Sequence, residues 1–152
     1  MKLACAFDHA GVPLRETVVT ALQSAGHETV DLGVADDYPD VALAVGRAVA
    51  NGEVERGVVV CGSGAGVSVA ACKLPGIRAT VAHDHYTAEQ CVGHDNCNVL
   101  CIGARVVGTA IAAELVQAFA DAAFSGEERH VRRLGKVDAI ERDGLNANFE
   151  GS

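Results

Sequence analysis

The segment 57–73 constrains the fold of this chain more than any other stretch. Three consecutive valines at 58–60 predict a strand buried on both faces in a parallel sheet. Cys61, alternating glycines and a helical pattern follow directly. Glycine lets the backbone turn tightly and approach a ligand closely, and successive N–H groups in such a turn attract an anion or the oxyanion of an enolate. The segment therefore predicts a thiol and a stabiliser of negative charge at one place.

The same turn also has a purely structural interpretation. Its spacing, Gly62-x-Gly64-x-Gly66, differs from the dinucleotide fingerprint Gly-x-Gly-x-x-Gly, and no Lys-Ser or Lys-Thr pair closes it as in a P-loop. Cys61 can equally be a small buried hydrophobe. The position of the turn at the end of a strand favours ligand binding, because open α/β sheets bind ligands there.

Size and charge narrow the class of protein. A chain of 152 residues suits one domain, which we assign to residues 1–145, with a flexible tail at 146–152. A net charge of −8 argues against a general binder of nucleic acid or of membranes. No run approaches the roughly 20 apolar residues that span a bilayer, and the first residues lack the pattern of a secretory leader.

The six cysteines indicate a reducing compartment. Most of them lie within apolar strand or helix patterns, so we interpret them as free thiols of a cytoplasmic protein. Cys91, Cys97 and Cys101 together with His94 offer a zinc cluster as the alternative. That alternative is the weaker one, because no Cys-x-x-Cys pair is present.

Strand and helix patterns alternate along the whole chain. We expect strands at 2–7, 28–32, 58–61, 78–82 and 99–102, and helices at 13–24, 40–51, 65–73, 86–92, 109–124 and 127–142. This order predicts an α/β fold with a parallel sheet and helices on both of its faces.

Polar residues gather where the predicted strands end. Asp8 and His9 follow the first strand, Cys61 ends the third, and a His-Asp-His run at 83–85 follows the fourth. Ligands of such folds bind at the carboxyl ends of the strands. We place His94, in the turn before the fifth strand, at the same edge, and we expect Asp8, His9, Cys61 and His94 to converge there.

Positive charge is concentrated near the end of the chain. Arg129 and Arg133 lie four residues apart, which places them on one face of a helix. Two guanidinium groups so placed suit a phosphate group. The alternative is a solvated turn in which they pair with Glu127 and Glu128, and Arg132 points elsewhere.

Together these pieces resemble type B ribose-5-phosphate isomerase and its galactose-6-phosphate isomerase relatives. The resemblance follows family order and covers nearly the whole chain to about residue 141. Its pieces are Asp-His-Ala-Gly at 8–11, Asp-Tyr-Pro at 37–39, Cys-Gly-Ser-Gly-Ala-Gly at 61–66, Ala-Ala-Cys-Lys at 70–73 with Gly-Ile-Arg at 76–78, His94 with Asn98, Gly-Ala-Arg-Val-Val-Gly at 103–108, and Arg129-His130 with Arg133.

The resemblance implies a three-layer α/β/α sandwich around a five-stranded parallel, Rossmann-like sheet of order 2-1-3-5-4. It implies a homodimer, or a tetramer of two such dimers, with active sites at the dimer interface. It also implies isomerisation of a sugar phosphate between aldose and ketose through a cis-enediolate, without a metal or another cofactor. One branch of the family uses a cysteine base and another uses a glutamate six residues later. Here Cys61 is present and Val67 fills the later position, as in the cysteine branch.

The resemblance also implies roles for single residues. Cys61 is the base, Ser63 assists proton movement between the two sugar oxygens, and His94 with Asp8 opens the sugar ring. The remaining positions bind substrate: His9, Gly62, Gly64, Ala65, Gly66, Asp95, Asn98, Arg105, Arg129 and Arg133.

Four departures from the family pattern leave the sugar open. Asp95 stands where ribose-type members usually carry asparagine, Ser63 is often threonine, the loop 33–38 is short, and the His-Asp-His run at 83–85 is not a general feature of those members. Ribose 5-phosphate is the first candidate substrate. The alternatives are the same chemistry on a four- or six-carbon sugar phosphate, such as an erythrulose, allose or galactose phosphate. A phosphosugar-binding module without catalysis and one subunit of a heteromer are further alternatives.

Overall fold

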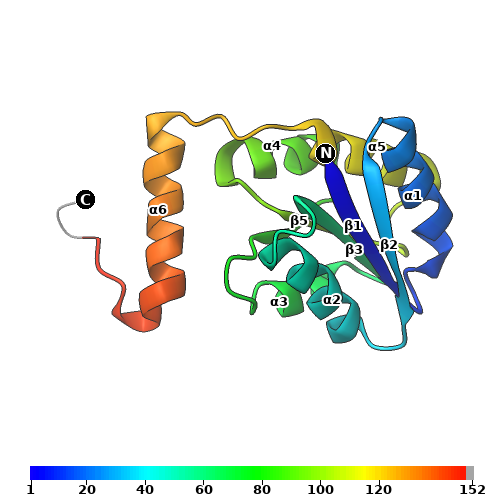
Figure 1. The fold of residues 1–152 in the computed structure, drawn as a ribbon, viewed down its shortest axis with the longest axis horizontal. Helices are drawn as coiled ribbons and strands as arrows, with labels where there is room; N and C mark the ends of the chain where they lie inside the picture. The colour runs from blue at the N-terminus through cyan, green and yellow to red at the C-terminus, as the bar shows by residue number, and fades with distance from the viewer. Residues whose placement is uncertain (150–152) are drawn as a thin grey trace.

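Five short strands form one parallel sheet in the computed structural model, which describes residues 1–149 (Figure 1). Their order is β2-β1-β3-β5-β4, as the resemblance implied. The bounds are β1 Lys2–Asp8, β2 Glu28–Ala35, β3 Arg56–Cys61, β4 Ala79–Val81 and β5 Val99–Gly103. The chain runs from β1 outward to β2 and then returns to place β3 on the other side of β1. Ligands of open α/β sheets bind outside the carboxyl ends of the strands at such a reversal, here between β1 and β3.

Helices cover both faces of the sheet, which confirms the three-layer α/β/α architecture. The helices are α1 Arg15–Ser24, α2 Tyr38–Ala50, α3 Ala65–Ala71, α4 His85–Asp95, α5 Thr109–Asp121 and α6 Glu128–Asp143, with short 3-10 turns at Val12–Leu14 and Gly144–Asn146. The core formed with α1, α4 and α5 lies on one side of the sheet, and the core formed with α2 and α3 lies on the other. Within residues 1–149, no helix is both long and apolar enough to cross a bilayer.

Successive side chains along β1, β3 and β5 pack into opposite cores. Phe7, Val60 and Ile102 belong to the core with α1, α4 and α5. The next residues along β3 and β5 point the other way, because side chains alternate across a strand. Cys61 therefore belongs to the core with α2 and α3 and is only 4% exposed.

The main differences from the predicted elements lie at the element ends. The helix predicted at 13–24 begins as a 3-10 turn, Val12–Leu14, with Pro13 in its first turn. β2 extends past the predicted residue 32 to Ala35. Its apolar alternation is broken by Asp31 and Gly33, and an edge strand paired on one side only needs no continuous apolar pattern.

The last helix, α6, stands apart from the sheet (Figure 1). Residues 122–127 carry the chain from α5 to α6, which packs against α4. Three of its apolar side chains, Val131, Val137 and Ile140, are each about half exposed. The tail predicted at 146–152 is described as far as residue 149, and its last three residues lie outside the described part of the chain.

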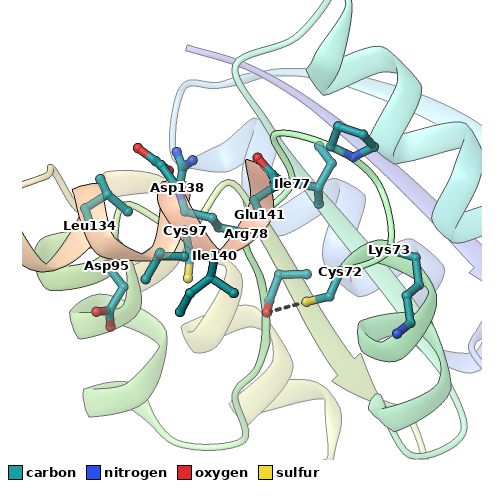
Figure 2. Close-up of a pocket in the computed structure, with 13 residues that line it drawn as sticks. Cys72, Lys73, Ile77, Arg78, Asp95, Cys97, Leu134, Asp138, Ile140 and Glu141 are labelled. Atoms are coloured by element: carbon teal, nitrogen blue, oxygen red, sulfur yellow. Dashed lines mark hydrogen bonds between the residues drawn. The ribbon is translucent and has the colours of Figure 1, made fainter. Parts of the chain in front are cut away.

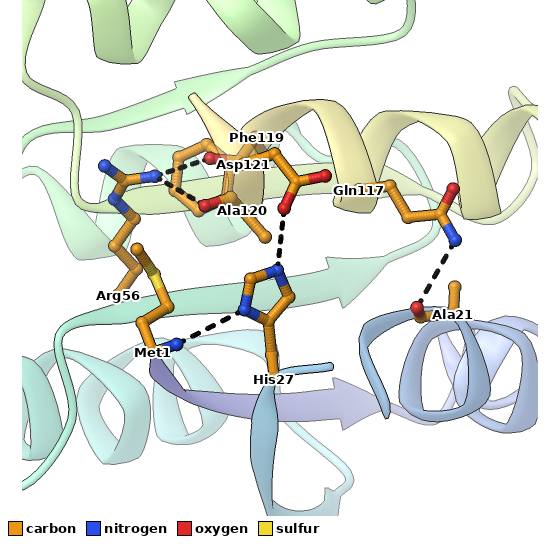
Figure 3. Close-up of polar contacts among 8 residues, drawn as sticks. All are labelled: Met1, Ala21, His27, Arg56, Gln117, Phe119, Ala120 and Asp121. Carbon is orange, nitrogen blue, oxygen red and sulfur yellow. Dashed lines mark hydrogen bonds and ion pairs between the residues drawn. The ribbon is translucent and has the colours of Figure 1, made fainter. Parts of the chain in front are cut away.

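An arginine and a histidine fasten the amino edge of the sheet to the end of α5 (Figure 3). The Arg56 guanidinium donates to the carbonyl oxygens of Phe119 and Ala120 at 2.6 and 3.2 Å and lies 5.5 Å from the centre of the Phe119 ring. His27 lies between the terminal ammonium group, at 3.4 Å, and a carboxylate oxygen of Asp121, at 3.0 Å. Cations near the carboxyl end of a helix offset the partial negative charge of its last carbonyls.

Candidate active site

Three strands bring the first group of predicted site residues into one row. Phe7 of β1 is opposite Val60 of β3, and Cys61 is opposite Gly103 of β5. Asp8, Cys61 and Gly103 therefore end neighbouring strands at the same edge of the sheet. This row lies where the strand order reverses, which is the edge at which open α/β sheets bind ligands.

The Cys61 sulfur is held by the glycine-rich turn that follows it. The backbone N–H of Gly64 donates to Cys61 Sγ at 3.1 Å. Gly64 has φ +80°, a left-handed conformation that an L side chain rarely adopts, and it is the residue from which α3 begins. This hydrogen bond orients the sulfur that the resemblance assigns to the base.

The turn itself uses two of the amides that the sequence assigned to an oxyanion. The Gly64 N–H points to the sulfur, and the Ala65 N–H donates to Ser63 Oγ at 3.2 Å. The amides of Gly62, Ser63 and Gly66 are the ones left as candidates for an enediolate oxygen. Three of the five backbone amides of residues 62–66 therefore remain for a ligand, because the turn itself uses the other two.

The turn after β5 is hydrogen-bonded to the Cys61 loop. Ala104 and Arg105 donate their backbone N–H groups to the carbonyls of Cys61 and Gly62 at 2.8 and 3.0 Å. A Cβ on Gly62 would lie 3.4 Å from Nη1 of Arg105, so the Arg105 side chain passes directly over that glycine. The predicted binding residue Arg105 thus lies beside the predicted base.

Asp8 and His9, at the end of β1, are each held by hydrogen bonds to backbone groups. The buried Asp8 carboxylate accepts the backbone N–H groups of Ala10 and Gly11 at 2.9 and 2.8 Å. His9 Nδ1 lies 2.9 Å from the carbonyl oxygen of Asp36. Since a carbonyl only accepts, Nδ1 carries the proton and Nε2 is the acceptor nitrogen of the neutral ring.

Sequence reasoning left two residues of this edge out of the site. The Tyr38 ring lies against Gly66, where a Cβ would meet three ring atoms at 3.1 Å. His83, after β4, accepts the backbone N–H of Gly103 through Nε2 at 2.9 Å. The Asp-Tyr-Pro run at 37–39 and the His-Asp-His run at 83–85 were visible as motifs, but their contacts depend on how separate loops meet.

His94 lies elsewhere, and its predicted convergence with Cys61 is wrong for a single chain. It belongs to the last turn of α4, which precedes β5. Residues before a parallel strand lie at its amino end, whereas Cys61 pairs with the last residue of β5. The four steps from Val99 to Gly103 alone span about 13 Å, far beyond the roughly 3 Å of a hydrogen bond.

His94 instead belongs to a second group of residues, on α4, α6 and the segment before α6. Its ring stacks on that of His130 in α6, with centroids 4.1 Å apart and an angle of 29° between the planes. Gln90 Nε2 lies 2.8 Å from His94 Nδ1, and Ser125 Oγ lies 2.6 Å from His130 Nδ1. Burial lowers the pKa of His130, and the neighbouring His94 ring lowers it further.

The two arginines belong to this second group. Arg129 and Arg133 flank the stacked His130 in the first turns of α6. Nε of Arg129 pairs with Glu127 at 2.9 Å, and both side chains of the pair are more than half exposed. The local ion pair predicted as an alternative is thus present for Arg129, and exposed pairs of this kind are weak enough to exchange for another anion.

A cavity of about 580 Å³ lies between α6 and the segment that follows α3 (Figure 2). Apolar side chains from both walls enter it, among them Ile77, Leu134 and Ile140. Asp95, at the end of α4, also lines it. Asp95 therefore faces the inner side of α6 rather than the Cys61 edge.

Asn98 has a structural position at the amino edge. Its Oδ1 accepts the backbone N–H of Arg78, and its Nδ2 donates to the carbonyl of Gly76, both at 2.8 Å. The side-chain amide therefore closes the loop before β4. Its predicted role in binding substrate has no geometric support in a single chain.

The remaining cysteines do not form the alternative zinc cluster. Cys91 and Cys97 lie in the core with α4, and Cys101 lies on the opposite face of the sheet. The Cys97 thiol donates to Cys91, which lowers the pKa of Cys91 and raises that of Cys97. Burial raises the pKa of Cys5 to about 12. Residues 1–149 contain no group of three or more His, Cys, Asp or Glu side chains suited to a metal ion.

Comparison with known proteins shows the family to which this chain belongs. The chain is 41% identical over 145 residues to ribose-5-phosphate isomerase B of Escherichia coli, covering 93% of this chain and 97% of that protein. It is 36% identical over 148 residues to D-erythrulose-4-phosphate isomerase 2 of Mycolicibacterium smegmatis, with coverages of 93% and 97%. The structure of Trypanosoma brucei type B ribose 5-phosphate isomerase superimposes with a TM-score of 0.88 at 45% identity, covering 91% of this chain and 97% of that one. Residues 3–137 match the Ribose/Galactose Isomerase family, and the chain belongs to that family.

Proposed function

We propose that this protein interconverts an aldose phosphate and a ketose phosphate with the Cys61 thiolate as the base. The observation that carries the proposal is the Gly64 N–H directed at Cys61 Sγ at the carboxyl edge of the sheet. The thiolate removes the proton from carbon 2 of the aldose, and the resulting thiol returns it to carbon 1. Ser63 moves the hydroxyl proton between the two oxygens, and nearby amides stabilise the enediolate.

We infer ribose 5-phosphate and ribulose 5-phosphate as the leading substrate pair. Relatives named for ribose 5-phosphate and for erythrulose 4-phosphate both align over nearly the whole chain, so a four-carbon substrate is the main alternative. Measuring kcat/KM on four-, five- and six-carbon sugar phosphates ranks the candidate substrates. Highest kcat/KM on the four-carbon pair would replace the ribose assignment and leave the reaction class intact.

We further propose that the working enzyme is a homodimer with each site shared between two chains. One half-site holds Asp8, Cys61 and Arg105, and the other holds His94 and Arg129, at the opposite edge of the same sheet. A second copy can bring the second half-site to the first. The half-exposed side chains of Val131, Val137 and Ile140 on α6, together with the cavity beside that helix, supply the kind of apolar surface that a stable dimer buries. Pairing of two dimers into a tetramer is the larger alternative.

Complementation tests the shared site directly. Cys61→Ala and His94→Ala should each be inactive on ribose 5-phosphate, but together they should recover about a quarter of the wild-type activity, since random pairing makes half the dimers mixed and each mixed dimer has one intact site of two. Cys61→Ala combined with Asp8→Asn is the matched control, because both changes fall in one half-site. Recovery in the control pair, or none in the first pair, contradicts the shared site.

We propose a cytoplasmic location and a reduced state for the thiols. All six cysteines are free, and five of them are buried. A protein that carries a buried catalytic thiol beside other free thiols suits a reducing compartment. The partner that the charge pattern supports is a small phosphorylated sugar, and neither nucleic acid nor a membrane.

A further inference from the structure

At the carboxyl edge of the sheet, the imidazole of His83 accepts a backbone N–H of β5 that no residue of β4 reaches. β4 ends at Val81, which is opposite Cys101 of β5. Two residues further on, His83 is level with Gly103, where the backbone ladder has stopped. His83 Nε2 accepts the Gly103 N–H at 2.9 Å and thereby continues the ladder by a side chain.

The Gly103 backbone is packed without spare room against the predicted catalytic turn. A Cβ on Gly103 would lie 2.6 Å from the carbonyl carbon of Ser63, and a Cβ on Gly64 would lie 3.2 Å from the Gly103 nitrogen. The residues after Gly103 then hold the carbonyls of Cys61 and Gly62. A shift of the Gly103 amide is therefore transmitted to the Gly64 N–H at the sulfur and to the Arg105 side chain.

We propose that His83 is a positioning residue, whose neutral ring holds the Gly103 amide and so fixes Arg105 and the Ser63–Gly64 turn around Cys61. The bond requires one tautomer: Nε2 accepts, and Nδ1 carries the proton. A protonated ring has a hydrogen on both nitrogens and faces the Gly103 N–H with a second donor. Acid therefore breaks this contact.

The surroundings of His83 keep it neutral at physiological pH. Burial lowers the pKa of His83, and the negative charge of Asp84 opposes this shift without reversing it. Other titratable or charged groups at this corner include His85 on α4, which pairs with Glu114 of α5 at 2.9 Å. Cys61 and Arg105 lie on the two turns that meet at Gly103. The contact is therefore intact near pH 7 and is lost as the pH falls below the ordinary imidazole value of about 6.5.

Two substitutions separate positioning from general stability. His83→Leu removes the acceptor, and His83→Gln replaces it with an amide oxygen that no acid protonates in this range. We expect His83→Leu to lower kcat/KM by about tenfold, the usual effect of one lost hydrogen bond at a buried amide. We expect His83→Gln to recover most of that loss and to remove the His83-dependent part of the acid limb in the pH profile. A side chain that only stabilises the fold would change the melting temperature and leave the shape of the profile unchanged.

NMR of the labelled protein tests the contact without relying on activity. The Gly103 amide should titrate with the His83 ring in the wild type, its hydrogen exchange should speed up in His83→Leu, and the ring should be the Nδ1–H tautomer. Cys61→Ala should keep all of these signals while losing turnover. Because the inference rests on the proposed function only for its kinetic part, an active Cys61→Ala enzyme would overturn the base and leave the NMR result to stand. An Nε2–H tautomer, or unchanged Gly103 exchange in His83→Leu, overturns the inference.

Discussion

The His94 ring lies face to face with the buried His130 ring, 4.1 Å between centroids, and so joins the end of α4 to α6. This stack sets α6, which holds Arg129 and Arg133, beside the end of α4, as the proposed second half-site requires. Two stacked rings that were both protonated would repel each other. The Ser125 hydroxyl fixes the buried ring, and Gln90 fixes the other.

Stability should fall as the pH drops below about 6.5, the ordinary pKa of an imidazole. Burial lowers the pKa of His130 and of His83 in the folded protein. Between the folded and unfolded pKa values, the unfolded chain binds more protons than the folded chain. The free energy of unfolding therefore decreases as the pH falls from about 6.5 until the folded pKa values are reached. Urea unfolding at pH 7.5, 6.5 and 5.5 measures the slope. His130→Gln should flatten it, whereas the exposed His85→Gln serves as a surface control. Equal slopes in all three proteins would remove His130 from this account.

The arginines of α6 should act on substrate capture more than on turnover. Arg129→Ala and Arg133→Ala should each raise KM between about tenfold and a hundredfold, the value of a charge-assisted hydrogen bond. kcat should change less, because the phosphate is remote from the reacting carbons. Arg132→Ala is the matched control on the same helix, since sequence spacing turns it to another face. Steady-state kinetics of the three variants measure KM and kcat. An equal rise of KM in Arg132→Ala would refute the assignment of Arg129 and Arg133 to phosphate binding.

The sequence placed Asp8 and Cys61 at one edge of the sheet because both positions follow local rules. A valine run ends at Cys61, a glycine turn follows, and parallel strands deliver their ends to one edge, which also places Asp8. The mistake with His94 concerns direction: α4 returns the chain from the carboxyl edge to the amino edge, so its last turn lies far from Cys61. The stack on His130 depends on where α6 lies, and no local pattern encodes that.

His83 illustrates a second limit. Its motif was visible, but its role depends on β4 stopping at Val81 while β5 continues to Gly103. Strand ends are set by competition between backbone pairing and side-chain contacts across the sheet. Only the three-dimensional register reveals that an imidazole replaces a carbonyl there.

Replacing Gly103 by alanine should damage both the fold and the site. The new Cβ would meet the Ser63 backbone at 2.6 Å, which forces the two turns apart. Overpacking of this kind costs about 1–3 kcal/mol of unfolding free energy, and kcat/KM should fall with it. Gly135→Ala in α6 is the control, because open space surrounds that position and alanine favours a helix by about 0.5–1 kcal/mol. Denaturant unfolding compares them, and a Gly103→Ala protein as stable as the wild type would show that the turns can separate freely.

Arg56 should contribute more to stability than an exposed arginine. Arg56→Ala leaves the Phe119 and Ala120 carbonyls without their charged donor and removes the contact with the Phe119 ring (Figure 3). We expect a loss of about 2 kcal/mol, typical of a hydrogen bond to a charged group. Arg15→Ala, which removes a partly exposed pair with Asp31, should cost less than about 1 kcal/mol. Equal losses in urea unfolding would mean that the amino-edge contact adds nothing beyond a surface pair.

The last prediction separates ring opening from isomerisation at His94. Opening a furanose requires a group that gives and takes a proton near neutral pH, which an imidazole does. A four-carbon aldose phosphate has its terminal oxygen blocked and forms no such ring, so it needs no opening. His94→Ala should therefore lose about a hundredfold or more of kcat/KM on ribose 5-phosphate and much less on erythrose 4-phosphate. Cys61→Ala is the comparison variant and should lose both activities alike. If His94→Ala impairs the two substrates equally, His94 belongs to the proton transfer between carbons or to binding, because only a ring-opening group distinguishes a cyclic substrate from an open one.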